Sequence, residues 1–170
     1  MNISAGHWHV GTGAVGLIDE VTEARRVVRQ VANLLQQQGV NVRVIFDNAS
    51  KNQRQNLNYL IGAHQKGKGL HISVHFNAVG KATKNALGTE VLYAKPTMQK
   101  LAATMSAAIS TAGGLRNRGA KRRTDLAFLN TLPDAILIEV CFVNSQEDVA
   151  CYKRHFEAIC VAIATELSVK

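Results

Sequence analysis

Residues 135–140 have the sequence AILIEV, a nearly continuous apolar run. A run of this length and composition is typical of a strand that is buried on both faces, as in a parallel sheet covered by helices. Glu139 interrupts the run, and a carboxylate is costly to bury without a partner. The stretch therefore predicts a central strand and marks Glu139 as a candidate functional residue.

Strands and helices are expected to alternate along the rest of the chain. Segments rich in β-branched or alternating apolar residues predict further strands at Asn2–Ala5, Asn41–Phe46, Leu70–His75 and Thr89–Tyr93. Apolar residues at three- and four-residue steps predict helices at Glu20–Gln38, Asn52–Lys66, Thr97–Ala112 and Val149–Leu167. Asp19 is a suitable N-cap for the first helix, and Gly39 is a suitable stop. This order predicts an α/β layered fold with a largely parallel sheet.

Length and composition indicate one globular domain. The chain has 170 residues, of which 46% are hydrophobic and two are prolines. Its apolar stretches are shorter than the roughly 20 residues that a membrane span needs, and no leader precedes the first strand. We therefore expect no membrane span, and synthesis in the cytoplasm without a signal peptide. Cys141, Cys151 and Cys160 form an odd set without CxxC spacing, which is typical of reduced packing residues.

The charge is strongly positive and unevenly distributed. The net charge is +8 and the pI about 9.7, so the surface should attract polyanions, either nucleic acid or an anionic cell wall. One segment holds many of the cations and several glycines, and its basic residues are Arg116, Arg118, Lys121, Arg122 and Arg123. Glycine breaks regular structure, which predicts a loop here. The loop either is simply solvated or contacts an anionic substrate or surface.

Candidate catalytic residues fall where the strands end. Ligands of open α/β sheets gather beyond the carboxyl ends of the strands. His7 follows the first predicted strand, and His75 closes the third. Glu139 lies near the end of the last strand, and Glu20 opens a helix that begins on the same edge. Two imidazoles and two carboxylates are therefore expected to converge on one rim.

This set of side chains favours metal-assisted hydrolysis. Two histidines and one carboxylate are a common catalytic zinc set that leaves a position open for water. Zinc lowers the pKa of bound water to about 7. A second carboxylate nearby could accept the proton of that water and pass it to a leaving amine.

Each candidate also has a simpler explanation. Glu20 could merely favour the positive end of a helix dipole. His71 shares a strand face with His75 but lies away from the strand end, as a packed or rim histidine would. His9 is an alternative ligand, and Trp8 beside it could only pack.

The glycines of the first loop suggest a second interpretation. Gly11, Gly13 and Gly16 spell GTGAVG, which matches the GxGxxG pattern of dinucleotide-binding folds. That pattern should follow the first strand directly and open the helix. Here GHWHV separates the strand from the glycines, and the helix begins only at Glu20. We therefore give the dinucleotide interpretation low weight.

Several segments, in order, resemble the zinc-dependent N-acetylmuramoyl-L-alanine amidases of cell-wall autolysins and phage endolysins. The similar segments are AGH at Ala5–His7 with GAVG at Gly13–Gly16, EVTEAR at Glu20–Arg25, SVHFNA at Ser73–Ala78, GTEVLY at Gly88–Tyr93 and LIEVCFVNSQED at Leu137–Asp148. One such segment alone would be weak, but their common order makes the resemblance strong.

The resemblance implies a role for each candidate. It implies that His7, Glu20 and His75 bind Zn²⁺ and that Glu139 is the catalytic carboxylate. It implies hydrolysis of the amide between the muramoyl lactyl group and L-alanine of peptidoglycan. It also implies a mixed, mostly parallel twisted sheet of about five or six strands, flanked by helices on both faces.

The same resemblance sets expectations for the whole chain. Residues 1–170 should form a single catalytic amidase domain without a separate wall-binding module, acting at the bacterial cell wall after phage-type release. The basic surface should contact anionic wall polymers, and no nucleic acid is expected. Trp8 and Cys141 stand where many family members have glycine, so the mouth of the site should differ. The rival interpretations are a zinc peptidase that cuts the stem peptide, a non-catalytic wall- or nucleic-acid-binding module, and a nucleotide-dependent oxidoreductase.

Overall fold

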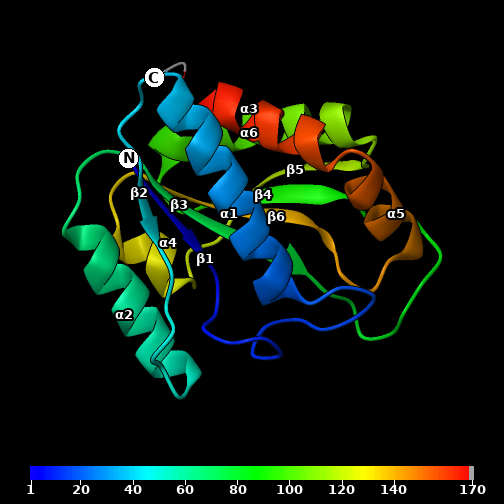
Figure 1. Cartoon of the computed structure of the whole chain (residues 1–170), viewed down its shortest axis with the longest axis horizontal. Coiled ribbons are helices and arrows are strands. Elements are labelled where there is room, and N and C mark those ends of the chain that lie inside the picture. Colours follow the sequence, from blue (N-terminus) through cyan, green and yellow to red (C-terminus); the bar gives the residue numbers. More distant parts are fainter. Residues whose placement is uncertain (169–170) are drawn as a thin grey trace.

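The computed structural model describes residues 1–168, and its centre is a six-stranded sheet with the strand order β2-β1-β3-β6-β4-β5 (Figure 1). The strands are β1 (Asn2–Ala5), β2 (Arg43–Ile45), β3 (His71–Asn77), β4 (Thr89–Tyr93), β5 (Asn117–Arg122) and β6 (Ala135–Phe142). All neighbouring strands run parallel except β4 and β6, which are antiparallel. The predicted mixed, mostly parallel α/β fold is confirmed.

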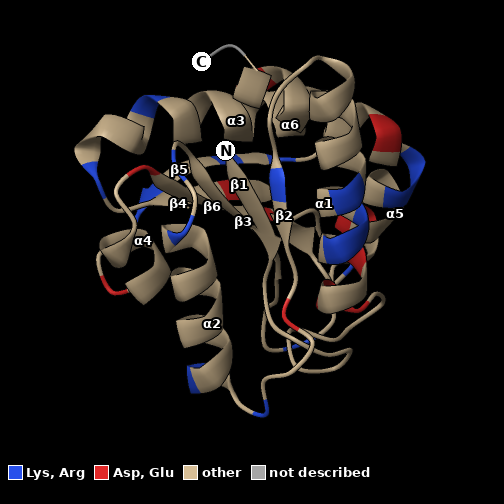
Figure 2. Cartoon of the chain, turned by 60° about the vertical axis from the view of Figure 1, so that its left-hand side comes forward, with Lys and Arg blue, Asp and Glu red and all other residues tan. Residues whose placement is uncertain are grey.

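Helices cover both faces of the sheet, but unequally (Figure 2). The helices are α1 (Glu20–Gln37), α2 (Gln53–Gln65), α3 (Gln99–Gly113), α4 (Ala127–Thr131), α5 (Gln146–Arg154) and α6 (Phe156–Ser168), and a short 3₁₀ turn, Pro96–Met98, precedes α3. The larger core lies between one face and α1, α3, α5 and α6. On the other face, a smaller apolar cluster under α2 and α4 includes Leu92, Phe128 and Leu137. This second face is the one that carries the candidate site.

The predicted ends of α1 are confirmed. The side chain of Asp19 accepts a hydrogen bond from the backbone N–H of Thr22, which caps the helix at Glu20. Gly39 follows the last turn with a positive φ of 76°, which suits a glycine better than other residues. Glu20 is therefore held at the first position of a well-defined helix.

Two local predictions were wrong, and one helix was missed. The basic segment predicted as a loop is in fact β5, an edge strand that pairs in parallel with β4. The short helix α4 was not predicted. The single C-terminal helix predicted at Val149–Leu167 is two helices, because α5 ends at Arg154 and His155 caps it before α6 begins.

Strand register explains which side chains share the second face. His71, Ser73 and His75 on β3 lie beside Ala135, Leu137 and Glu139 on β6. At the beginning of β6, Ala135 and Leu137 pack in the interior under α2 and α4. Farther along the two strands, His75 and Glu139 are only partly buried. The candidate site therefore lies on this second face of the sheet, beyond the part that α2 and α4 cover.

Two smaller expectations also agree with the structure. Cys141 and Cys160 are buried, Cys151 is half-buried, and all three are free thiols. None of the helices within residues 1–168 combines the length and the apolar character that crossing a membrane requires.

Candidate active site

His7 lies just beyond β1 in an unusual backbone conformation. Its φ is 59°, and it is the only non-glycine residue with a positive φ in the described part of the chain. Its Nε2 lies 3.2 Å from Oε2 of Glu20, while its Nδ1 is buried without a hydrogen-bond partner. The imidazole is thus directed into the interior of the site rather than toward solvent.

Glu20 is the buried centre of the cluster. Its Oε1 lies 2.9 Å from Nδ1 of His75 and accepts the backbone N–H of Phe76 at 3.2 Å. Its Oε2 accepts the backbone N–H of Ala14 at 2.6 Å. Burial alone would raise the pKa of Glu20, but the hydrogen bonds and charges of His7 and His75 outweigh it and hold the pKa well below its usual range. Glu20 is therefore an anion between two imidazoles.

Two glycines permit this close approach. A Cβ on Gly6 would lie 2.1 Å from Cε1 of His75. A Cβ on Gly13 would lie 2.5 Å from Oε2 of Glu20 and 2.7 Å from Cδ2 of His7. Packed atoms do not approach this closely, so a side chain at either position would displace the cluster residue that it meets. Gly13 thus gives one glycine of the GTGAVG run a packing role that needs no dinucleotide.

The donor set fits a metal ion. One ligand atom each from His7, Glu20 and His75 lies within 4.8 Å of the others, and these three form the candidate metal-binding cluster found among residues 1–168. Two imidazoles and a carboxylate match the open catalytic zinc sets of proteins. The buried Nδ1 of His7, which has no partner in the protein, is a further sign that the cluster is incomplete by itself.

Glu139 lies beside the cluster but outside it. It is the direct register partner of His75 on β3 and of Glu90 on β4. Its Oε2 is buried and has no hydrogen-bond partner. Burial, together with the charges of Glu20 and Glu90, raises its pKa to about 8. A carboxyl group with such a pKa can exchange a proton near neutral pH.

A second polar group next to Glu139 was not predicted. Glu90 accepts a hydrogen bond from Nδ2 of Asn77 at 3.1 Å and from Nε of Arg118 at 2.7 Å. Glu90 faces Glu139 only because β4 runs antiparallel to β6. The segments SVHFNA and GTEVLY were noted in the sequence, but nothing in them reveals this strand direction.

The other histidines lie elsewhere. His9 is exposed in the first loop and does not join the cluster, whereas Trp8 beside it is mostly buried. His71 is buried and its Nδ1 lies 3.3 Å from Nδ1 of His64. His75, and not His71, is therefore the histidine of β3 that lies beside His7 and Glu20.

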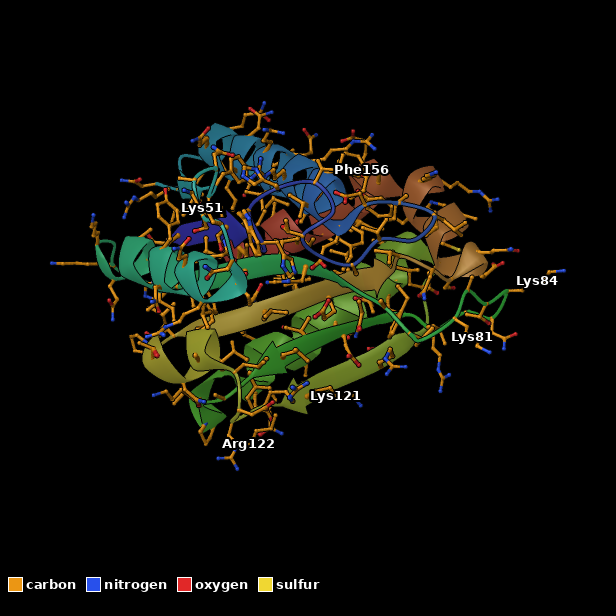
Figure 3. All side chains as sticks on the ribbon, turned by 90° about the horizontal axis from the view of Figure 1, so that it is seen from below. Lys51, Lys81, Lys84, Lys121, Arg122 and Phe156 are labelled. Atoms are coloured by element: carbon orange, nitrogen blue, oxygen red, sulfur yellow. The ribbon has the colours of Figure 1, made fainter. Side chains whose placement is uncertain are left out.

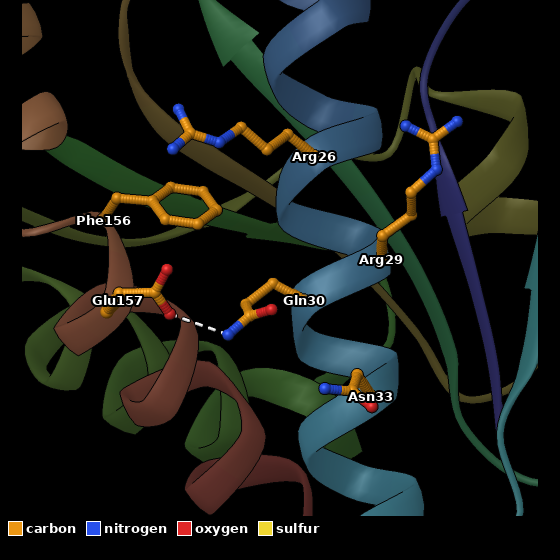
Figure 4. Close-up of a pocket in the computed structure, with 6 residues that line it drawn as sticks. All are labelled: Arg26, Arg29, Gln30, Asn33, Phe156 and Glu157. Atoms are coloured by element: carbon orange, nitrogen blue, oxygen red, sulfur yellow. Dashed lines mark hydrogen bonds between the residues drawn. The ribbon is translucent and has the colours of Figure 1, made fainter.

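A groove of about 260 Å³ opens beside His75. Its walls come from α2, α4 and the sheet, and they include the apolar residues Leu57, Leu60, Leu126, Phe128 and Leu137 and the polar residues Gln53, Asn56, Ser73 and Asp125. A larger cavity of about 450 Å³ lies between α1 and α6 (Figure 4). There Arg26 stacks on Phe156 and Glu157 is bonded to Gln30, so part of its polar lining is already paired. The groove beside His75 is the one that adjoins the cluster.

By its fold and these residues, the chain falls in the class of α/β proteins with a candidate metallohydrolase centre. The chain belongs to the N-acetylmuramoyl-L-alanine amidase family, whose model matches residues 2–168.

Known proteins similar to this chain support the assignment. The catalytic domain of CD27L endolysin targeting Clostridia difficile is 28% identical, with a TM-score of 0.87 over 99% of this chain and 96% of that one. The catalytic domain of CwlV, an N-acetylmuramoyl-L-alanine amidase from Bacillus (Paenibacillus) polymyxa var. colistinus, shares the fold, with 23% identity and a TM-score of 0.80 over 99% and 95% of the two chains. An uncharacterized protein of Clostridium perfringens (strain 13 / Type A) is 31% identical over 89% of this chain and 46% of its own length. The chain thus spans about half the length of the curated relatives it matches.

Proposed function

We propose that this chain hydrolyses the amide bond between the N-acetylmuramoyl lactyl group and L-alanine in peptidoglycan, in a reaction that depends on zinc. The observation that carries the proposal is the partly buried cluster of His7, Glu20 and His75, with Glu139 beside His75 on the neighbouring strand. Membership of the amidase family supports the choice of bond.

His7, Glu20 and His75 would hold the zinc ion. When bound, zinc supplies Lewis acidity, which activates water and stabilises negative charge on the scissile carbonyl oxygen. The protein contributes rigid placement of these three side chains: Glu20 is fixed by the backbone N–H groups of Ala14 and Phe76. Such outer contacts orient ligands and tune their affinity.

Glu139 would act as the general base and then as the general acid. In this role it accepts a proton from the attacking water and donates one to the departing nitrogen of L-alanine. Its raised pKa, caused by burial and by the charges of Glu20 and Glu90, suits both transfers near neutral pH. Glu90 is itself held in place by Asn77 and Arg118.

The groove beside His75 would receive the substrate next to the scissile bond. Its apolar wall, with Leu57, Leu126 and Phe128, can cover methyl and methylene groups. The polar side chains of Gln53 and Asp125 are available to orient amide groups. The groove thus combines apolar cover with a few polar contacts, as small-molecule sites commonly do.

We further propose that residues 1–170 act as a single catalytic domain at the bacterial cell wall. The last two residues of this range lie outside the described structure. Cations exposed at the surface favour contact with anionic wall polymers. Viewed from below, Lys121 and Arg122 lie along β5 at one margin, and Lys81 and Lys84 project from the loop before β4 (Figure 3).

Mass spectrometry of digested peptidoglycan tests the proposal. Purified walls are incubated with the protein, with the protein and a chelator, and with chelated protein to which zinc is returned. Free stem peptides beginning at L-alanine, lost on chelation and restored by zinc, are the expected result. Fragments cut within the stem peptide would indicate a peptidase, and an absence of products from several wall types would contradict hydrolysis.

A further inference from the structure

We propose that Arg25, Asp47 and Asn56, called here the His7 clamp, are positioning residues that hold His7 in its metal-binding orientation. This inference rests on the proposed function, because it assigns a purpose to residues outside the metal cluster. None of the three offers a ligand atom to the cluster found in the described chain. Each is instead bonded to the backbone around His7 or to another member of the clamp.

His7 requires such support because its backbone is strained. A φ of 59° places it in the left-handed region, which residues with a Cβ rarely adopt. The residue lies in a loop, beyond the last pairing of β1, where no strand or helix enforces this conformation. Strained residues persist only when surrounding contacts determine their conformation.

Asn56 supplies one of these contacts. It is buried on α2, and its Nδ2 donates to the backbone carbonyl of His7 at 3.0 Å and to Oδ2 of Asp47 at 2.9 Å. Both partners can only accept, so the amide nitrogen must face them and the side chain has one orientation. The hydrogen bond to His7 fixes the peptide group that joins His7 to Trp8.

Asp47 orients the clamp. It is fully buried after β2, and its Oδ1 accepts the backbone N–H groups of Ala49 and Ser50 at 2.9 and 3.1 Å. Its other oxygen accepts from Asn56. A carboxylate fixed in this way gives Asn56 little freedom to turn away from His7.

Arg25 supplies the second contact to the loop. Its NH2 group donates to the backbone carbonyl of Trp8 at 2.7 Å and to that of Asp47 at 2.6 Å. The carbonyls of two consecutive residues, His7 and Trp8, are thus held from α2 and from α1 respectively. Rotation of the strained peptide would break buried hydrogen bonds on both sides, which is unfavourable.

The test compares zinc affinity in Asn56→Ala with that in Asn58→Ala, using competition with a chelator of known affinity. Asn58 is a matched control, because it lies on the same helix but is exposed. We expect Asn56→Ala to bind zinc about tenfold to a hundredfold more weakly, the usual effect of losing an outer contact to a metal ligand. Asn58→Ala should bind zinc like the parent protein.

A double-mutant cycle separates positioning from folding. If Asn56 acts through His7, Asn56→Ala should cause no additional loss of zinc affinity in a His7→Ala background. Thermal unfolding in excess chelator reports any effect on the metal-free fold. The inference is overturned if Asn56→Ala lowers metal-free stability but leaves zinc affinity at the parental value, or if its effect persists without His7.

The cycle also distinguishes this inference from the proposed function. Weaker zinc binding in Asn56→Ala, combined with no release of stem peptides by the parent, would support the clamp and contradict the amidase reaction. A parent protein that does not bind zinc would overturn both the clamp and the metal assignment.

Discussion

At the scale of single residues, the candidate site holds two carboxyl groups in different surroundings: Glu20 lies within the cluster, and Glu139 lies beside it. Glu20 is ionised between two imidazoles, whereas burial and neighbouring charges raise the pKa of Glu139 to about 8. Two carboxyl groups with opposite pKa shifts in one site are suited to different tasks. The proposed division of roles between a metal ligand and a proton carrier thus rests on the different surroundings of the two carboxyl groups.

This separation predicts distinct results for Glu139→Gln. The variant keeps the shape of the side chain but cannot carry the proton, so turnover should fall by about a hundredfold to ten-thousandfold. Its zinc content should equal that of the parent, because Glu139 is outside the cluster. Metal analysis and the rate of stem-peptide release measure the two effects. Glu147→Gln, an exposed acid on α5, is the control, and near-parental turnover in Glu139→Gln would exclude it as the base.

The sequence was informative about residues whose position depends on strand ends. His7, His75 and Glu139 follow or close predicted strands, and parallel strands bring such ends to one edge. The sequence could not place Glu90, because its contact with Glu139 depends on the antiparallel direction of β4. It also could not predict the positive φ of His7, which tertiary contacts impose.

At the scale of elements, prediction succeeded where burial leaves a pattern. α1 packs through one face, so its apolar residues recur with the helical period, and β6 is buried on both faces, so it is a nearly continuous apolar run. β5 lacks this signal, because an edge strand with partly exposed residues needs no apolar face and only one pairing partner. The break between α5 and α6 at His155 likewise has no proline or glycine to announce it.

The packing of α2 against the sheet leads to a prediction of how the stability of the fold depends on pH. His64 on α2 is fully buried, and its ring lies edge-on to Phe128 and next to His71 at the start of β3. Burial, with the charges of His71 and Arg43, lowers the pKa of His64 from 6.5 to about 3. Between about pH 3 and pH 6.5, the unfolded chain therefore binds a proton at His64, whereas the folded chain does not. The free energy of unfolding should thus fall as the pH falls from about 6.5.

We expect His64→Leu to weaken this acid dependence. One proton accounts for up to about 1.4 kcal/mol of unfolding free energy per pH unit, and the variant removes that proton. Urea unfolding at several pH values between 7 and 4 measures the slope. His9→Leu, in an exposed loop, should retain the parental slope, and an unchanged slope in His64→Leu would show that other groups cause the acid sensitivity.

At the scale of the whole molecule, lysines and arginines lie both away from the candidate site and beside it. The net charge of +8 is spread over the surface, and blue segments appear on several helices and strands in Figure 2. Arg118 on β5 donates to Glu90, the register partner of Glu139, whereas Lys121 and Arg122 on the same strand are exposed. Charge reversal at Lys121 and Arg122 can therefore test attraction to a polymer while the Arg118–Glu90 pair stays in place.

Charge reversal on β5 tests whether this edge contacts anionic wall polymers. Lys121→Glu combined with Arg122→Glu should weaken binding to walls, most strongly at low salt where screening is least. The control is Lys153→Glu with Arg154→Glu on α5, which changes the net charge equally. Co-sedimentation with walls before and after removal of their anionic polymers measures the effect. Equal losses in both double variants would indicate a general charge effect without a specific role for β5.

The two edge strands of the sheet influence how the protein behaves in concentrated solution. At one end β2 has only three residues, and at the other β5 has the sequence NRGAKR. Open strand edges can recruit strands from another molecule, and short length and positive charge both oppose this. Two copies approaching through β5 would bring rows of cations together, and β2 offers too few backbone groups to compensate. The molecule should therefore resist edge-to-edge aggregation without any covering domain.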